Sequence, residues 1–580
     1  MKTSQQQYSL LQATSNIFNS LVSDPAIPIP DAARAKASVV RFTLPDTSAG
    51  SLPILPCIFK ECETVAALKG LEGVVASALA EFRYHDDDDA VKNDSVTVDL
   101  QHATMFLFMT YVASVDGLTK LDPAVKKKLK DTDLLAAQSD PYRRMSANLY
   151  RTKDGKFFHI HGSLEATTTL NLIGLPGYIP GFTDYGEIIK TIEGAVMKFT
   201  AAELEVMNEE KGQAGVTALT REEFLASPHG KLMSSLPIWE SEILERETPP
   251  VTFSPSPSAG PTKRQVLNGI KVLELCRIIA GPTISRILAE YGAEVLKITG
   301  PGLSDVPFFQ VDGNMGKRTA DLDLKSPEGR AQFEKLVVEA DVIVDGYRTG
   351  AFARLGYPPS YFSDIAKQRG RGFVYVSENC FGFKGEWAHR PGWQQIADCV
   401  SGVAWAHGRS MGRDEPVIPP FPMSDYGTGC IGAIATLSAL YKRATEGGSY
   451  WATTSLVQYD LLLMKQGTYP DWLWKRIRDM HDPSVKALRY CDSVDRISAT
   501  ALQSCIRIQP DLFLEAFGKE KDGITDEEFN RNSRYMERHY SEGFKGTIKV
   551  LKPVVHMKSC KNGFKIVSRP NAFDSANWQI

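Results

Sequence analysis

Strands and helices alternate over residues 270–376, and this alternation limits the fold more than any other feature of the chain. Residues 270–275 predict a strand, residues 283–291 a helix after an Ala-Gly-Pro turn, and residues 294–298 the next strand. Further strands are predicted at residues 319–324, 341–345 and 372–376, and a further helix at residues 327–339. Strands joined by helices of this length form an α/β, doubly wound parallel sheet. Ligands bind such a sheet beyond the carboxyl ends of its strands.

A smaller α+β domain is expected ahead of the sheet. Residues 147–161 predict a β-hairpin around an Asp-Gly turn. A later stretch rich in proline, serine and threonine has the composition of a linker. We therefore predict four parts: an N-terminal part at residues 1–247, a linker at 248–266, the sheet domain at 267–475, and a helical C-terminal segment with a returning strand at 476–580.

The N-terminal part contains a weak echo of the sheet domain. Residues 71–112 follow the order helix, charged loop, strand and apolar helix, and residues 428–464 follow a similar order. We interpret the first segment as a degenerate copy, which has lost the sheet-forming part and any equivalent of Asp425.

The composition excludes several classes of protein. With 43% hydrophobic and 23% charged residues, the chain is typical of globular proteins. A net charge of −3 gives no basis for bulk electrostatic binding to nucleic acid. No apolar run reaches the length of about 18 residues that a membrane span requires. The nine cysteines form no Cys-x-x-Cys pair and no targeting segment is recognisable, so we expect a cytoplasmic protein.

Two groups of residues raise the question of a metal site. His159 and His161 lie two apart on one face of the predicted hairpin, but no third ligand lies nearby in the sequence. Residues 86–89 are four successive aspartates, whose mutual repulsion favours a solvated loop. We therefore predict that the protein binds no metal.

A proline-rich segment followed by an apolar run contains the candidate catalytic residue. Prolines forbid a helix up to Pro422, and the apolar pattern at residues 430–441 predicts a buried helix. Asp425 is therefore expected just before a helix start, on an approach that contains two glycines. Two interpretations remain open: an N-cap aspartate, or a carboxylate nucleophile that a bulky thioester can reach.

Several short segments match one known family in order and spacing. They are Val272-Leu273-Glu274-Leu275, Ile279-Ala280-Gly281-Pro282, residues 288–298, Gly316-Lys317-Arg318-Thr319, residues 322–329, residues 340–345, Tyr347-Arg348-Thr349-Gly350, Arg354-Leu355-Gly356 and residues 424–429. Over residues 269–466 the chain resembles the family III CoA-transferases, which include formyl-CoA transferase, carnitine CoA-transferase and alpha-methylacyl-CoA racemase. The arrangement, with the small domain ahead of the sheet, is similar to that of the longer fungal members.

The resemblance implies a fold, substrates and a mechanism. The fold is a Rossmann-like CoA-binding domain with a smaller α+β domain, in a dimer of interlocked subunits. The activity is that of an acyl-CoA:carboxylate CoA-transferase, with an acyl-CoA donor, a carboxylic acid acceptor and coenzyme A as part of the substrate. Asp425 becomes the catalytic residue, which attacks the thioester and passes through a mixed anhydride and an aspartyl-CoA thioester.

The resemblance also implies which residues contact coenzyme A. They are Ile278, Ile279, Ala280, Leu322, Lys325, Tyr347, Arg354 and Gln394. Among them, Lys325 and Arg354 suit phosphate groups, and Tyr347 suits packing against the adenine ring.

Three positions depart from the pattern of the family. Thr299-Gly300-Pro301 replace an acidic residue and an arginine that often follow the second strand. Trp393 stands where the racemase branch has a catalytic histidine, and Gln394 stands where many transferases carry an acid. The glycine-rich loop of the small domain is not evident, with Gly162 and Ser163 as its nearest candidates.

Two other functions stay open at this point. An acyl-CoA racemase or isomerase would use Asp425 as one acid/base, with His389 or His407 in place of the missing histidine. A CoA-thioester-binding protein without transferase activity would retain the fold and the contacts with coenzyme A.

Overall fold

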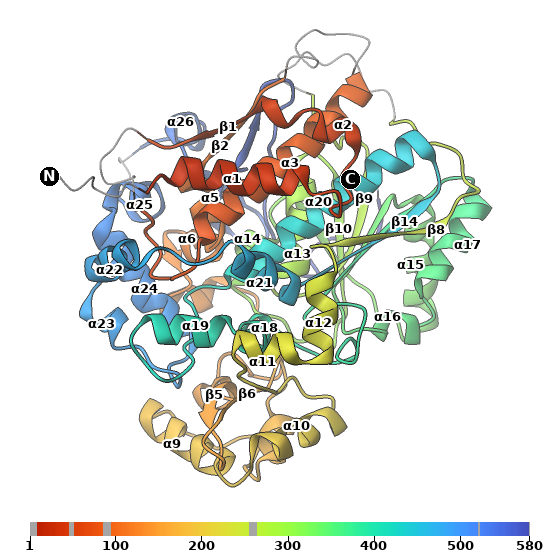
Figure 1. The fold of residues 1–580 in the computed structure, drawn as a ribbon. Coiled ribbons are helices and arrows are strands. Elements are labelled where there is room, and N and C mark those ends of the chain that lie inside the picture. The colour runs from red at the N-terminus through yellow and green to blue at the C-terminus, as the bar shows by residue number, and fades with distance from the viewer. Residues whose placement is uncertain (1–7, 46–51, 85–93, 254–263, 520–522, 579–580) are drawn as a thin grey trace, which may run out of the picture.

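A seven-stranded sheet forms the centre of the computed structural model, which describes residues 8–45, 52–84, 94–253, 264–519 and 523–578 (Figure 1). The strand order is β11-β10-β9-β12-β13-β14-β8. The strands are β8 (Glu240–Glu245), β9 (Lys271–Leu275), β10 (Glu294–Thr299), β11 (Lys317–Asp321), β12 (Val342–Asp345), β13 (Val374–Asn379) and β14 (Ser449–Ser455). All neighbours pair in parallel except β8, which is antiparallel to β14. The predicted α/β class and parallel sheet are therefore confirmed.

Helices cover both faces of this sheet. On one face, valines of β9, β12 and β13 pack in a core with α13 (Ala280–Glu290) and α20 (Met423–Glu446). On the other face, Leu273 of β9 and Leu296 of β10 pack against α15 (Pro327–Glu339) and α17 (Pro359–Arg369). Successive strand residues point to opposite faces, so a strand covered on both sides has apolar residues on both.

Helix α20 begins seven residues earlier than the sequence predicts. Its glycines explain the error, because each one lies against a neighbouring helix. A Cβ on Gly427 would meet the Tyr459 ring at 1.9 Å, and one on Gly429 would meet Thr283 Cβ at 2.5 Å. The expectation that these glycines form an open approach to Asp425 is therefore wrong: they allow α20 to pack closely.

The N-terminal part packs directly on α20. Helix α3 (Glu61–Tyr84) is followed by β2 (Val96–Asp99) and α5 (Leu100–Phe106), and β2 forms a small sheet with β1 (Val40–Thr43) and β17 (Val555–Met557). One continuous core joins α3, α20 and α13. Residues 86–89 lie outside the described residues, so the structure does not test the predicted aspartate loop.

The predicted hairpin is confirmed and forms a projecting lobe with α9 (Tyr185–Val196) and α10 (Ala201–Glu210), at the bottom of Figure 1. Its strands are β5 (Ala147–Arg151) and β6 (Phe157–His161). Near the C-terminus, β16 (Gly546–Leu551) gives the predicted returning strand. Most of the predicted linker lies outside the described residues. Among the described helices, none combines the length and apolarity needed to cross a bilayer.

Candidate active site

Asp425 lies in the first turn of α20 and lines two cavities at once. The N-cap of the helix is Pro422, so the interpretation of Asp425 as an N-cap residue is wrong. Within the described part of the chain, no hydrogen bond or ion pair holds its carboxyl group. The free N–H groups of the first turn and the helix dipole favour a negative charge here. A carboxyl group without a partner at the junction of two cavities is available for chemistry.

The first cavity has a volume of about 770 Å³ and lies beyond the carboxyl ends of the parallel strands. Segments that follow β9, β10, β11 and β12 each contribute to its wall. Seven of the eight residues expected to contact coenzyme A line it, namely Ile278, Ile279, Ala280, Leu322, Lys325, Tyr347 and Arg354. The cavity thus brings together residues that are far apart in the sequence.

Several cations line the first cavity, and cations of this kind suit phosphate groups. Besides Lys325 and Arg354, the wall includes Arg277, Arg348 and Arg390. The Arg277 guanidinium lies 5.7 Å from the Tyr347 ring centroid and donates to the carbonyl oxygen of Ser304. Sequence reasoning missed these three arginines. Arg348 lies within the family segment Tyr347-Arg348-Thr349-Gly350, and Arg277 adjoins Ile278.

The second cavity, of about 500 Å³, meets the first at Asp425. Most of its wall comes from segments outside the predicted sheet domain and from the loop between β10 and α14 (Phe309–Gly313). Apolar and aromatic side chains predominate around Tyr111, Phe308 and Phe421. Two cavities that share one carboxyl group can hold two parts of a substrate, one on each side of the reacting atom.

Two strained backbone positions flank Asp425. Ile278 has φ = 70° and Phe421 has φ = 65°, in the left-handed region that residues other than glycine rarely adopt. Ile278 lines both cavities and Phe421 lines the second. Strain of this kind persists where the surrounding structure fixes a functional site.

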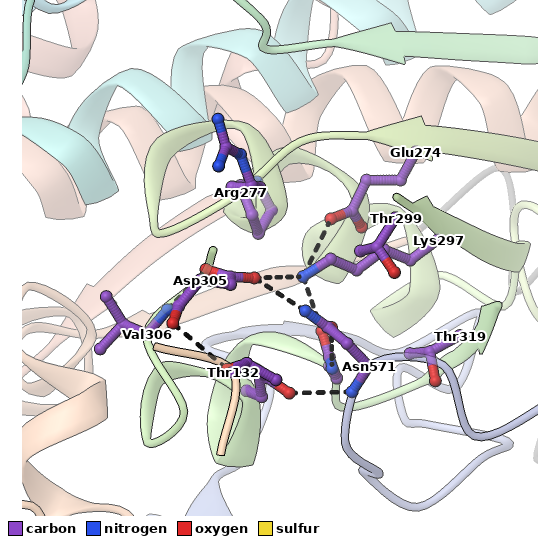
Figure 2. A network of polar contacts seen from close by, with 12 residues as sticks. Thr132, Glu274, Arg277, Lys297, Thr299, Asp305, Val306, Thr319 and Asn571 are labelled. Carbon is purple, nitrogen blue, oxygen red and sulfur yellow. Dashed lines mark hydrogen bonds and ion pairs between the residues drawn. The ribbon is translucent and has the colours of Figure 1, made fainter. Parts of the chain in front are cut away.

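A buried polar network holds the loop that follows β10 (Figure 2). The Lys297 ammonium lies 3.9 Å from the Glu274 carboxylate and 3.7 Å from that of Asp305. Asn571, from the C-terminal tail, donates to Asp305 at 2.8 Å, and the Asp305 N–H donates to the Thr132 carbonyl oxygen at 2.8 Å. Three distant segments thus fix the loop after β10, which lines both cavities.

Glu378 is a second carboxyl group in the first cavity and was not predicted. It is 9% exposed at the end of β13, and burial raises its pKa to about 8, with Asp345 adding to the effect. Burial, with Glu378 nearby, also holds the pKa of Asp425 well above its ordinary value. Perturbed carboxyl groups in a cleft are typical of functional sites. The rule that ligands bind at strand ends could have identified Glu378.

Gln394 is the eighth residue expected to contact coenzyme A. It lines the second cavity and does not line the first, so it lies apart from the other seven. Its amide donates to Asp398, whose carboxyl group also accepts from Ser424 Oγ at 3.2 Å. Burial raises the pKa of Asp398 to about 8. Gln394 therefore takes part in a polar support beneath the start of α20.

Trp393 and the two hairpin histidines form a stacked group beside the cavities. The His161 ring lies 5.6 Å from the His159 ring and 5.4 Å from the Trp393 ring, centroid to centroid. The Trp393 N–H donates to Ser163 Oγ at 2.8 Å, and Ser163 lines both cavities. Burial lowers the pKa of both histidines, which keeps them neutral. The hairpin thus contributes a wall to the site.

The two histidines considered as replacements for a racemase base lie elsewhere. His389 is exposed and pairs with Glu209 at 3.3 Å, and His407 is buried. Neither lines either cavity in the described part of the structure. Their suggested role as the second base at Asp425 is therefore wrong.

Comparison with known proteins identifies the family to which this chain is similar. A family model described as CoA-transferase family III matches residues 267–487. An acetyl-coenzyme A transferase of Hypoxylon pulicicidum is 32% identical over 532 residues, 89% of this chain and 87% of that protein. An acyl-CoA transferase of Gibberella moniliformis is 30% identical, over 87% of this chain and 85% of that protein.

Other relatives match a smaller share of the chain. A formyl-CoA:oxalate CoA-transferase of Rhodopseudomonas palustris is 28% identical over 204 residues, 33% of this chain and 46% of that protein. A solved CaiB/BaiF family protein from Brucella suis aligns at 20% identity, over 53% of this chain and 97% of that chain, with a TM-score of 0.36.

The sheet, the basic cavity and the relatives together define a class, the enzymes that transfer coenzyme A. Within this class, the chain belongs to CoA-transferase family III.

Proposed function

We propose that this enzyme is an acyl-CoA:carboxylate CoA-transferase that works through a covalent intermediate on Asp425. The single observation that carries the proposal is the place of the Asp425 carboxyl group, without a partner, where the two cavities meet. The first cavity would hold the nucleotide and pantetheine parts of the thioester. The second would hold the acyl group and then the acceptor acid.

The chemistry begins with attack of an Asp425 carboxylate oxygen on the thioester carbonyl carbon. The C–S bond breaks, the CoA thiolate leaves, and a mixed anhydride forms. The thiolate then attacks the Asp425 carbonyl carbon, which releases the donor acid and forms an aspartyl-CoA thioester. The acceptor carboxylate displaces the thiolate to give a second anhydride. Attack of the thiolate on the acceptor acyl carbon then yields the new thioester and free Asp425.

The strand order supports the Rossmann-like character of the proposed CoA-binding domain. From β9 the chain first adds β10 and β11 on one side, and then β12, β13 and β14 on the other side. The order therefore reverses between β9 and β12. The crevice at such a reversal is the usual ligand site of open α/β sheets. Ile278, Ile279 and Tyr347, which follow β9 and β12, line the first cavity at this crevice.

Intact-mass spectrometry tests the proposal. The protein is mixed with a panel of acyl-CoAs and then with hydroxylamine, beside the Asp425→Ala variant. An adduct that maps to Asp425 and is absent from the variant is the expected result. Binding of coenzyme A without an adduct from any donor would refute the covalent mechanism.

A second candidate function is an acyl-CoA racemase or isomerase, and one observation favours it. Glu378 and Asp425 line the same cavity, and both have a raised pKa, so two carboxyl groups are available to exchange a proton at the α-carbon. Exchange of substrate α-hydrogen for deuterium in D₂O, lost in Glu378→Gln, would support this function. Adduct formation without exchange would exclude it.

A further inference from the structure

We propose that the second cavity selects carboxylic acids that carry a second anionic group, which Arg144 and Lys120 bind. The inference rests on the proposed function, because it assigns the acid exchanged at Asp425 to this cavity. The substrate class is a dicarboxylic acid, or its thioester, with an apolar middle. Arg144 and Lys120 lie outside residues 267–487, so the region that defines the family does not contain them.

The middle of the cavity is apolar and aromatic. Phe421 precedes Asp425 by four residues, and its ring packs against Tyr111 of α6 (Met109–Val112), 5.3 Å between centroids. Phe308 contributes from the loop after β10, and Phe309 from the start of α14. A wall of this kind stabilises methylene groups of a substrate and gives no hydrogen bonds to a polar middle.

Beyond this wall lies a group of three charges. The Lys120 ammonium is 5.0 Å from the Tyr111 ring centroid and 2.7 Å from Asp495 Oδ1. Arg144, at the end of α7 (Pro141–Arg144), donates from Nε to Asp495 Oδ2 at 2.8 Å. All three side chains line the cavity, and those of Lys120 and Arg144 are largely shielded from solvent. Contacts run from Phe421 through Tyr111 to this group, and Asp425 lines the same cavity.

The charges of the group do not cancel. Asp495 neutralises one of the two cations, and each of its oxygens is already engaged. The two terminal nitrogens of Arg144 have no acceptor among the described residues. A guanidinium with a free fork at a cavity wall suits a carboxylate, which it binds with two parallel hydrogen bonds.

The other acidic groups of the wall are engaged by backbone N–H groups of their own loop. Asp133 is satisfied by its own loop, since its carboxylate accepts from the N–H groups of Ala137, Gln138 and Ser139. Asp131 accepts from the Asp133 N–H and is exposed, as is Lys126. Among the described residues, Arg144 and Lys120 therefore share Asp495 as their only acidic partner, and the group of three keeps one cation in excess.

The inference is tested with matched pairs of thioesters, in reactions that contain no acceptor acid. Glutaryl-, adipyl- and suberyl-CoA are each compared with the corresponding ω-methyl ester, which has the same chain but no second charge. The full-length protein is mixed with each thioester below saturation, and the rate of hydroxylamine-trapped labelling of Asp425 is measured. We expect the best diacid thioester to react about 10- to 100-fold faster than its ester, since hydrogen bonds between charged groups contribute that much.

Variants distinguish substrate recognition from a structural clamp. Arg144→Gln is expected to reduce the preference for diacid over ester to within about threefold, whereas a structural role would slow both reactions equally. Should Arg144→Gln fail to fold, Lys120→Met is expected to give a smaller loss of the same preference. Lys127→Met is the matched control, because Lys127 is exposed in the segment after Lys120 and lines neither cavity.

The outcomes separate the inference from the proposed function. Equal rates for diacid and ester, or a preference that survives both variants, overturn the inference while the labelling itself upholds the covalent mechanism. Labelling of Asp425 by no thioester overturns the proposed function and the inference with it.

Discussion

Replacing Glu378 with glutamine should make the protein more stable, and by an amount that grows with pH. Glu378 is 9% exposed, and burial raises its pKa from the ordinary 4.5 to about 8. At a pH between these two values, Glu378 keeps its proton in the folded protein and has lost it in the unfolded chain. Since the folded state then binds more protons, the free energy of unfolding falls as pH rises. The stability contribution is complete below pH 4.5 and is lost as pH rises through 8.

The magnitude follows from the same two values. A pKa shift of one unit corresponds to about 1.4 kcal/mol. Ionisation of Glu378 in the unfolded state therefore lowers the free energy of unfolding of the wild type by up to about 5 kcal/mol at pH 8. Glutamine keeps the shape of the neutral acid and does not ionise. The difference in unfolding free energy between Glu378→Gln and the wild type should therefore be small near pH 4.5 and largest at pH 8.

Urea and thermal unfolding from pH 5 to pH 8, without ligand, measure this difference. Glu542→Gln serves as the control, because Glu542 is an exposed residue in the turn between two strands. The control should show no increase of the difference with pH. A Glu378→Gln effect that is the same at pH 5 and pH 8 would refute the reasoning, because the carboxyl group would then be ionised equally in both states.

Three further predictions concern packing, binding and pH. Gly427→Ala should destabilise the protein by at least about 2 kcal/mol in urea unfolding, because its Cβ would meet the Tyr459 ring at 1.9 Å. Gly194→Ala is the control and should be neutral or stabilising, because Gly194 has open space around it. Equal effects of the two substitutions would contradict the packing role of Gly427. Arg354→Gln should raise KM for the acyl-CoA about tenfold with little change in kcat, and an unchanged KM in steady-state assays would exclude a phosphate contact. Labelling of Asp425 should speed up as pH rises, because its raised pKa leaves little carboxylate at low pH. Glu378→Gln should move this rise to lower pH, and an identical profile would contradict the coupling.

The local signals in the sequence were sufficient for the sheet and for one half of the site. Alternating strand and helix patterns predicted β9, β10, β12 and β13 close to their observed bounds. Residues such as Ile278 and Tyr347 immediately follow strands, so the fold alone places them at the same edge of the sheet. The family motif identified Asp425 without knowledge of its surroundings.

The helix start at Met423 was missed because its cause is not local. Glycines at positions 427 and 429 disfavour a helix when they are considered alone. They are helical because α20 packs against Tyr459 and Thr283, whose side chains occupy the space of the missing Cβ atoms. Packing against distant residues overrides propensity here, and no window of sequence contains that information.

By itself the sequence determined the α/β sheet, because strand and helix patterns extend over a few residues, and its resemblance to a known family implied the catalytic candidate and most of the residues that line the cavity proposed for coenzyme A. Only the tertiary structure decided the second cavity, whose charged end joins Lys120 and Arg144 to Asp495. It also decided the place of Glu378 in the cavity of Asp425. Burial and charge depend on which distant segments meet, so the pKa of each carboxyl group and the selectivity proposed for the site follow from the folded chain alone.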